Sequence, residues 1–170
     1  DTRSISKLIR DTNYTYVLLN HLLKRGEIRR VTKGYYTVYE DPSLLVYCLK
    51  PAYLGLQDAM SLHNLWEQET NPIIVTARKV RSGIRIVFGS IVLIRRVSPR
   101  YFFGYEYYKY NDFFLPVSDI EKTFIDMVYF NEITKDSIKP FKNKIEKEKI
   151  QGFLKKYDKR FSSKVMSLIS

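Results

Sequence analysis

The sequence has few of the residues on which metal sites and many enzyme sites depend. It contains one cysteine, Cys48, and two histidines, His21 and His63, among 170 residues. A single cysteine excludes an intrachain disulfide and any zinc site built from several cysteines, and neither histidine stands at a metal-ligand spacing. We therefore expect no bound metal. We interpret Cys48 as a small buried hydrophobic residue and His63 as a packed helix residue.

Motifs of nucleotide-binding and hydrolytic enzymes are absent too, since the chain has no Walker loop, no GxGxxG and no GxSxG. No run of eighteen apolar residues predicts a membrane span. No signal peptide is recognisable, so we expect a cytoplasmic protein with no membrane partner.

Three carboxylates, Asp119, Glu121 and Asp126, lie on one predicted helix and could in principle hold Mg²⁺. Structural roles explain them better. Glu121 stands three residues after Ser118, which is the spacing of a capping box. Asp126 stands four residues after Lys122, which is the spacing of a helical ion pair. We predict no catalytic residue, no cofactor and no enzyme activity.

Positive charge is abundant, and its excess over negative charge is confined to the two ends of the chain. The net charge is +11. Residues 1–39 hold eight Lys and Arg against three Asp and Glu, residues 40–130 hold ten of each, and residues 131–170 hold eleven against five. Such segregation favours a polyanionic partner, above all a nucleic acid, contacted by the ends. The alternative is a basic protein that has no such partner.

The pattern of residues 1–41 predicts a winged helix-turn-helix. "SISKLIR" at 4–10 and the stretch 14–25 have the apolar spacing of helices. Gly26 ends the second helix, and residues 27–39 alternate as a basic hairpin. The usual trihelical core needs one more helix before Asp1, so we predict a winged unit without its first helix.

Two groups of residues in this unit are candidate contacts to double-stranded DNA. A recognition helix presents polar side chains to the major groove, and a wing reaches the flanking backbone or the minor groove. The predicted helix contacts are Asn13, Tyr14, Tyr16, Asn20 and Lys24, and the predicted wing contacts are Arg29, Arg30, Lys33 and Tyr35. In the alternative interpretation, one tyrosine packs into the core and half of the basic residues are merely solvated.

The rest of the chain predicts a linker over 42–51, a mixed α/β domain over 52–130 and a basic helical segment over 131–170. The expected elements of the middle domain are a helix at 55–67, strands at 72–78, 84–89, 90–97, 101–110 and 113–117, and a helix at 118–130 capped by Ser118. The fold class is therefore α+β, with an antiparallel-rich sheet and a helical C-terminal segment. The role of that segment stays open between a second DNA contact, a dimerisation element and a surface for a protein partner.

Three segments, in order, resemble the AbiEi-type antitoxins of type IV toxin–antitoxin systems. They are "LLKRGEIRRVTKGYYTV", "AYLGLQDAMSLHNLWEQETNPIIVTAR" and "FFGYEYYKYNDFFLPVSDIEKTFIDMVYF". The match covers roughly residues 5–130. The resemblance implies a sequence-specific transcriptional autorepressor that binds inverted repeats at its own promoter, as a dimer or as two chains. It also implies an antitoxin module at 52–130 that counters a nucleotidyltransferase-type toxin without being an enzyme.

Two other functions remain open on the sequence. The order helix, strands, helix also fits a degenerate or active restriction-nuclease-like core, for which Glu106 and Lys109 stand at the wrong spacing for E-x-K. The other function is a protein-interaction module that binds no DNA and whose basic ends only aid solubility.

Overall fold

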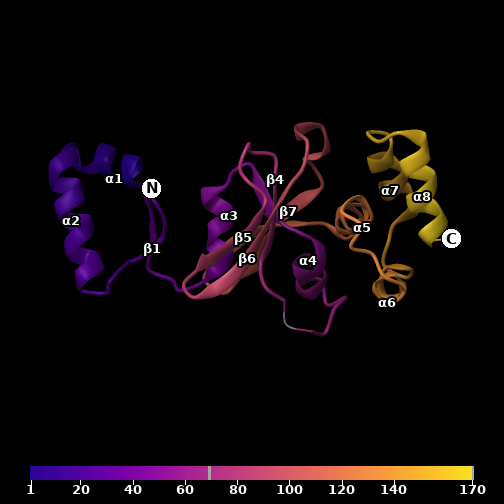
Figure 1. Cartoon of the computed structure of the whole chain (residues 1–170), viewed down its shortest axis with the longest axis horizontal. Helices are drawn as coiled ribbons and strands as arrows, with labels where there is room; N and C mark the ends of the chain where they lie inside the picture. The colour runs from indigo at the N-terminus through magenta and orange to yellow at the C-terminus, as the bar shows by residue number, and fades with distance from the viewer. Residues whose placement is uncertain (69, 170) are drawn as a thin grey trace.

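A computed structural model describes residues 1–68 and 70–169 of the chain, and it separates a small N-terminal unit from a larger body (Figure 1). The N-terminal unit consists of α1 (Thr2–Ile9), α2 (Thr12–Lys24) and the two-stranded hairpin β1 (Arg29–Thr32) and β2 (Tyr35–Thr37). The predicted helices and hairpin of this region are thus present. A short 3-10 turn, η1 (Pro42–Leu44), and helix α3 (Leu45–Cys48) lead into the body.

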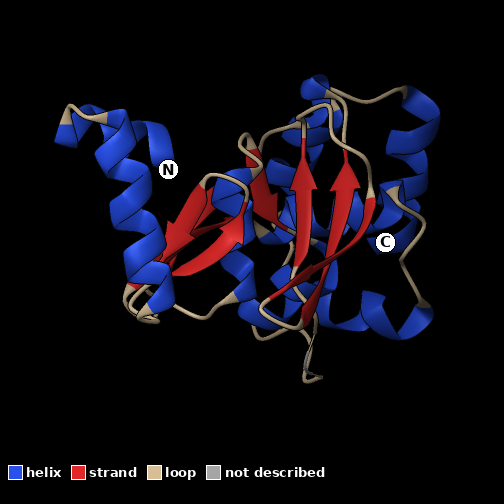
Figure 2. Cartoon of the chain, turned by 60° about the vertical axis from the view of Figure 1, so that its left-hand side comes forward, coloured by secondary structure: helices blue, strands red, loops and turns tan. Residues whose placement is uncertain are grey.

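The body is built on a six-stranded mixed sheet, seen in red in Figure 2. Its strands are β3 (Ala52–Leu54), β4 (Ile73–Thr76), β5 (Gly83–Val87), β6 (Ser90–Arg96), β7 (Tyr105–Tyr110) and β8 (Phe113–Ser118), in the order β5-β6-β4-β3-β8-β7. The pairs β3–β8 and β4–β6 are parallel, and the other three pairs are antiparallel. The predicted α+β class is confirmed in this form.

Helices cover the sheet, and further helices form the C-terminal part of the body. They are α4 (Leu56–Leu62), η2 (Pro99–Tyr101), α5 (Ile120–Tyr129), α6 (Lys135–Ile138), η3 (Lys139–Phe141), α7 (Lys147–Leu154) and α8 (Lys159–Ile169). Figure 1 shows α7 and α8 at the end of the molecule opposite to α2. No helix in the described part of the chain combines the length and apolar character needed to cross a bilayer.

Two hydrophobic clusters hold the body together. The first joins Tyr53 of β3 to Phe124 of α5 and to Phe141 and Val165 of the C-terminal helices. The second joins α3 to the sheet through residues such as Leu54. Because Phe141 and Val165 are fully buried, the lysine-rich residues after 130 contribute apolar side chains to the same core as the sheet.

Several element ends differ from the prediction for local reasons. The helix predicted over 55–67 ends at Leu62, and the strand predicted from 101 begins at Tyr105 because the chain forms a 3-10 turn first. The predicted cap Ser118 is wrong. Asp119 is the N-cap of α5 and accepts a hydrogen bond from the Lys122 amide at 2.8 Å.

The two side chains assigned to the capping box have other partners. The hydroxyl of Ser118 is buried and lies 2.7 Å from the hydroxyl of Thr123. Glu121 accepts a hydrogen bond from the amide of Glu146 at 2.9 Å, which joins α5 to the start of α7. The capping-box prediction therefore fails because both residues face the interior, where longer-range partners are available.

A buried ionic network crosses the first cluster. Lys122 pairs with Asp126 as the spacing predicted, and both side chains are fully inaccessible to solvent. The Tyr53 hydroxyl donates to Asp126 at 2.6 Å, and the hydroxyl of Tyr157 lies 3.4 Å from the Lys122 ammonium. Burial raises the pKa of Asp126 and lowers the pKa of Lys122, and the contact between the two opposes both shifts. The network ties β3, α5 and the residues after α7 to one another.

The outer strand β5 is one of the two edges of the sheet. Its side chains Ile84 and Ile86 are 60% and 66% exposed. The guanidinium of Arg85 donates to the main-chain carbonyls of Ile84 and Arg81, each at 2.9 Å. Two carbonyls at or beside this edge are therefore occupied by a side chain of the strand itself.

Candidate nucleic-acid interface

Helix α2 presents a row of exposed side chains. Asp11 caps it by accepting a hydrogen bond from the Tyr14 amide at 2.9 Å, and Thr15 and Leu19 form its buried side. Helical periodicity places four exposed residues on a row that points away from Leu19. We call this row the α2 stripe; it consists of Asn13, Val17, Asn20 and Lys24.

The stripe contains three of the predicted helix contacts and adds one. Val17 is 64% exposed between Asn13 and Asn20. Its methyl groups suit contact with a thymine methyl, while the neighbouring amides suit hydrogen bonds to base edges. Sequence reasoning missed Val17 because it selected polar and aromatic residues. The spacing 13, 17, 20 and 24 would have found it.

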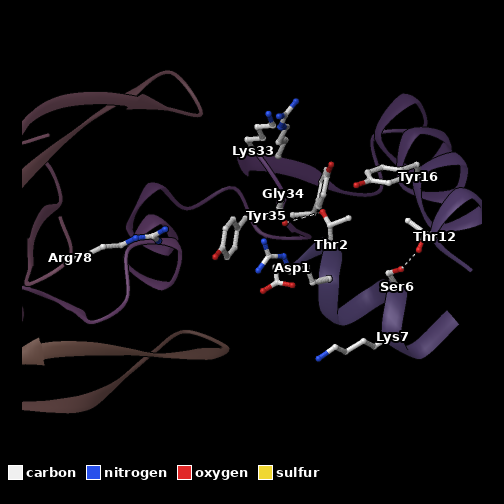
Figure 3. A pocket seen from close by; sticks show the side chains of 13 residues that line it. Asp1, Thr2, Ser6, Lys7, Thr12, Tyr16, Lys33, Gly34, Tyr35 and Arg78 are labelled. Atoms are coloured by element: carbon white, nitrogen blue, oxygen red, sulfur yellow. Dashed lines mark hydrogen bonds between the residues drawn. The ribbon is translucent and has the colours of Figure 1, made fainter. Parts of the chain in front are cut away.

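A cleft lies between α1, the start of α2, the β1–β2 hairpin and the loop after β4 (Figure 3). Its volume is about 890 Å³. The charged residues of its lining are five cations and one carboxylate: Arg3, Lys7, Arg30, Lys33, Arg78 and Asp1. Tyr16, Tyr35 and Tyr36 contribute aromatic rings, and Thr2, Ser6 and Thr12 contribute hydroxyls.

Hydrogen bonds between elements fix the walls of the cleft. The amide and the hydroxyl of Thr2 both donate to the carbonyl of Gly34, at 2.9 and 3.1 Å. Gly34 has φ +81° in the turn of the hairpin, a conformation that favours glycine. The hydroxyls of Ser6 and Thr12 lie 3.1 Å apart and connect α1 to α2. The first helix is therefore attached both to the wing turn and to α2.

The cations of the β1–β2 hairpin and of α1 divide into two electrostatic classes. Arg29 forms an ion pair with Glu40 at 3.0 Å. Among residues 1–68 and 70–169, neither Arg30 nor Lys33 forms an ion pair, and neither do Arg3 and Lys7 of α1. Charges without a protein partner can neutralise an external anion without first breaking a contact. Arg30, Lys33, Arg3 and Lys7 are therefore the more available cations.

The structure brings four of the nine predicted site residues together at the cleft: Tyr16, Arg30, Lys33 and Tyr35. Asn13, Asn20 and Lys24 lie on the stripe instead, and Tyr14 and Arg29 line neither. Tyr35 also packs partly against the second hydrophobic cluster. One predicted contact tyrosine therefore has a structural role as well.

Three cationic residues of the cleft were not predicted. Arg3 and Lys7 stand four residues apart on α1, so their helical spacing could have indicated a shared face. Arg78 follows β4 and reaches the cleft from the body. No local pattern connects it with the wing.

The carboxylates of the body do not form a metal site. Among the described residues, no group of three or more His, Cys, Asp or Glu could hold an ion. Asp119 and Glu121 both contact the Lys149 ammonium, at 3.1 and 2.9 Å. Glu106 and Lys109 are exposed on β7, three positions apart, so they point to opposite faces of the strand.

No protein-family model matches this chain, and no curated protein matches it either. The resemblance to AbiEi-type antitoxins therefore depends on the three quoted segments alone. What the geometry adds is an exposed helix stripe on the N-terminal unit and a basic cleft that this unit lines together with Arg78 of the body.

Proposed function

We propose that this chain binds duplex DNA through its N-terminal unit, which acts as a winged helix-turn-helix. In this arrangement the α2 stripe lies in the major groove and the β1–β2 hairpin lies against the flanking backbone. The observation that supports the proposal best is the cleft, whose five cations form no ion pair within the described residues and whose lining includes Thr12 and Tyr16 of the helix that carries the stripe. The lack of a metal-binding cluster in the described residues gives the nuclease alternative no comparable support.

The two parts of the interface have different tasks. Arg30 and Lys33 neutralise phosphates and release counterions, which supplies affinity on any sequence. Asn20 is suited to bidentate hydrogen bonding with adenine, and Val17 to contact with a thymine methyl. Base discrimination therefore depends on the stripe, while the cleft sets position along the backbone.

We extend the proposal to an autorepressor and antitoxin on the strength of the resemblance. The DNA is then the chain's own promoter, with one chain on each half of an inverted repeat. The module at 52–130 then counters a nucleotidyltransferase-type toxin without enzyme activity. A toxin gene of that type beside the gene for this chain is the first observation to seek.

The test is binding to the chain's own upstream DNA and to a scrambled duplex of equal length, across a salt series. We expect the upstream DNA to bind about 10³-fold more tightly, as is usual for specific readers. The double variant Arg30→Ala with Lys33→Ala should weaken binding to both duplexes. It should also lower the salt slope, which is the steepness of log K against log salt concentration, by about two. Asn20→Ala should instead lose preference for one base pair, by about 1–3 kcal/mol.

Arg29→Ala is the matched control for the wing variants, because Arg29 already forms an ion pair with Glu40. It should change affinity and salt slope less than Arg30→Ala does. Equal binding to both duplexes by the wild type would reduce the N-terminal unit to a nonspecific electrostatic surface. An unchanged salt slope in the double variant would remove the wing from the mechanism.

A further inference from the structure

One cation of the cleft comes from a different part of the molecule than the others. All residues that line the cleft lie within the first 36 positions, except Arg78. Arg78 follows β4, a central strand of the sheet. Figure 3 shows it on the body's side of the cleft, facing Asp1 and Tyr35 of the N-terminal unit. The cleft is therefore made by both parts of the chain.

The body holds Arg78 in place through its backbone and through one side-chain nitrogen. The amide of Arg78 donates to the hydroxyl of Thr76 at 3.0 Å, and that fully buried threonine donates to the carbonyls of Leu49 and Pro51. One terminal nitrogen of the guanidinium donates to the carbonyl of Cys48 at 2.9 Å. Arg78 is thus anchored to the segment that leads into the sheet.

The charge of Arg78 has no carboxylate partner in an ion pair among the described residues. A guanidinium carries five N–H donors in a planar fork, so a single carbonyl contact leaves most of its donors available. A phosphate accepts such a fork in the bidentate manner that makes Arg–phosphate contacts strong. The one carboxylate among the lining side chains of the cleft is Asp1. As the cap of α1, it accepts a hydrogen bond from the Ser4 amide at 2.9 Å.

The cleft continues past Arg78 into a smaller hollow of about 420 Å³ between the wing and α3. Asp1, Tyr35, Tyr36 and Arg78 line both spaces. Lys50 adds one more cation to the smaller hollow. Arg78 therefore stands where the basic surface of the wing passes onto the body.

We propose that the cleft binds phosphate groups between Arg78 of the body and the wing cations Arg30 and Lys33, so that a bound polyanion holds the two parts together. The inference rests on the proposed function, since a duplex backbone is the expected source of the phosphates. A free phosphorylated small molecule has the same chemistry and is the other source.

The experiment compares Arg78→Gln with Arg81→Gln in the full chain. Arg81 lies in the same loop and is exposed, but it does not line the cleft, so the two variants change charge equally. Binding of a fluorescent upstream duplex is measured across a salt series. We expect Arg78→Gln to weaken binding about tenfold and to lower the salt slope by about 0.9, the value for one released counterion. Arg81→Gln should change affinity less than twofold.

A second variant separates charge from structure. Arg78→Lys keeps the charge but loses the fork, so its affinity should fall between those of the wild type and Arg78→Gln. Thermal unfolding of all variants shows whether the contact to the Cys48 carbonyl matters for folding. Equal affinity and equal salt slope for Arg78→Gln and Arg81→Gln would overturn the inference.

A third arm uses inorganic triphosphate in place of the duplex and separates this inference from the proposed function. If the duplex does not bind but triphosphate binds and Arg78→Gln abolishes it, the cleft is a phosphate site and the DNA function fails. If Arg30→Ala with Lys33→Ala abolishes duplex binding while Arg78→Gln has no effect, the DNA function stands and this inference fails. Absence of binding to either probe contradicts both.

Discussion

The N-terminal unit and the body use positive charge in opposite ways. In the N-terminal unit, Arg30 and Lys33 line an open cleft and form no ion pair with any residue that the structure describes. In the body, Lys122 is fully buried against Asp126, and Lys149 bridges Asp119 and Glu121. Internal pairing joins α7 to the start of α5 and occupies the charges of α5, whereas unpaired charge remains available for an external anion. Net charge alone could not distinguish these two uses.

The same contrast holds for burial. Of the residues in α1 and α2, only Thr15 and Leu19 are buried, although Leu8 and Val17 are apolar and largely exposed. The body buries nearly a whole helix in α5, from Glu121 to Val128. The helices of the N-terminal unit thus keep most of their side chains at the surface, whereas α5 of the body packs most of its side chains into the core.

The largest effect is expected from breaking the buried pair of the body. Asp126→Ala leaves the Lys122 ammonium in the core without its partner and leaves the Tyr53 hydroxyl without its acceptor. We expect a loss of about 3–5 kcal/mol in the free energy of unfolding, measured by urea denaturation. The double variant Lys122→Met with Asp126→Leu should lose much less, since it removes both charges. A loss below about 1 kcal/mol for Asp126→Ala would contradict the assigned burial.

A smaller effect is expected from pH acting on the body. Burial raises the pKa of Asp58 to about 7. Hydrogen bonds to its carboxylate, such as the one from the Ile73 amide, oppose this shift only in part. Because the unfolded value is near 4, the folded state binds more protons between about pH 4 and 7, and stability falls as pH rises through that range. Asp58→Asn should reduce the total loss of stability between about pH 4 and 7 by roughly 2–4 kcal/mol.

The control for this prediction is Asp112→Asn, an exposed change in the turn between β7 and β8. It should leave the dependence of stability on pH unchanged between pH 4 and 7. Chemical denaturation at a series of pH values gives both results. If the free energy of unfolding changes with pH equally in the wild type and in Asp58→Asn, the prediction for Asp58 is wrong.

The smallest effects compare one kind of cap in the two regions. Asp11 and Asp119 each accept an amide hydrogen bond at the start of a helix, but Asp119 also pairs with Lys149. Asp11→Ala should cost about 1 kcal/mol and Asp119→Ala about 2 kcal/mol in stability. Amide hydrogen exchange should localise the first loss to α2. Equal losses would mean that the ion pair of Asp119 adds nothing.

Elements specified by local pattern were predicted well. The apolar spacing of residues 4–10 and 14–25 and the alternation of 27–39 depend on neighbouring residues, and α1, α2 and the hairpin lie there. The choice between Ser118 and Asp119 as cap could not be predicted, because both residue types cap helices. The backbone conformation decides which residue caps the helix, since Asp119 is extended, with ψ 171°, immediately before α5 begins.

Features that join distant residues were not predictable from spacing. The parallel pairs β3–β8 and β4–β6 bring together segments separated by other strands. The ammonium of Lys122 lies near the Tyr53 ring and the Tyr157 hydroxyl, and charged residues are rarely fully buried. The wing cations were found from sequence, but Arg78 joins them only through the placement of the whole sheet.

The edge strand β5 bears on how the chain is produced rather than on what it binds. Exposed isoleucines on an open edge are a template for pairing between molecules, above all when many chains are synthesised at once. The Arg85 guanidinium already occupies the carbonyls of Ile84 and Arg81, so an incoming strand would have to displace it. Solubility at high expression is thus expected to depend in part on one side chain that does not line the cleft.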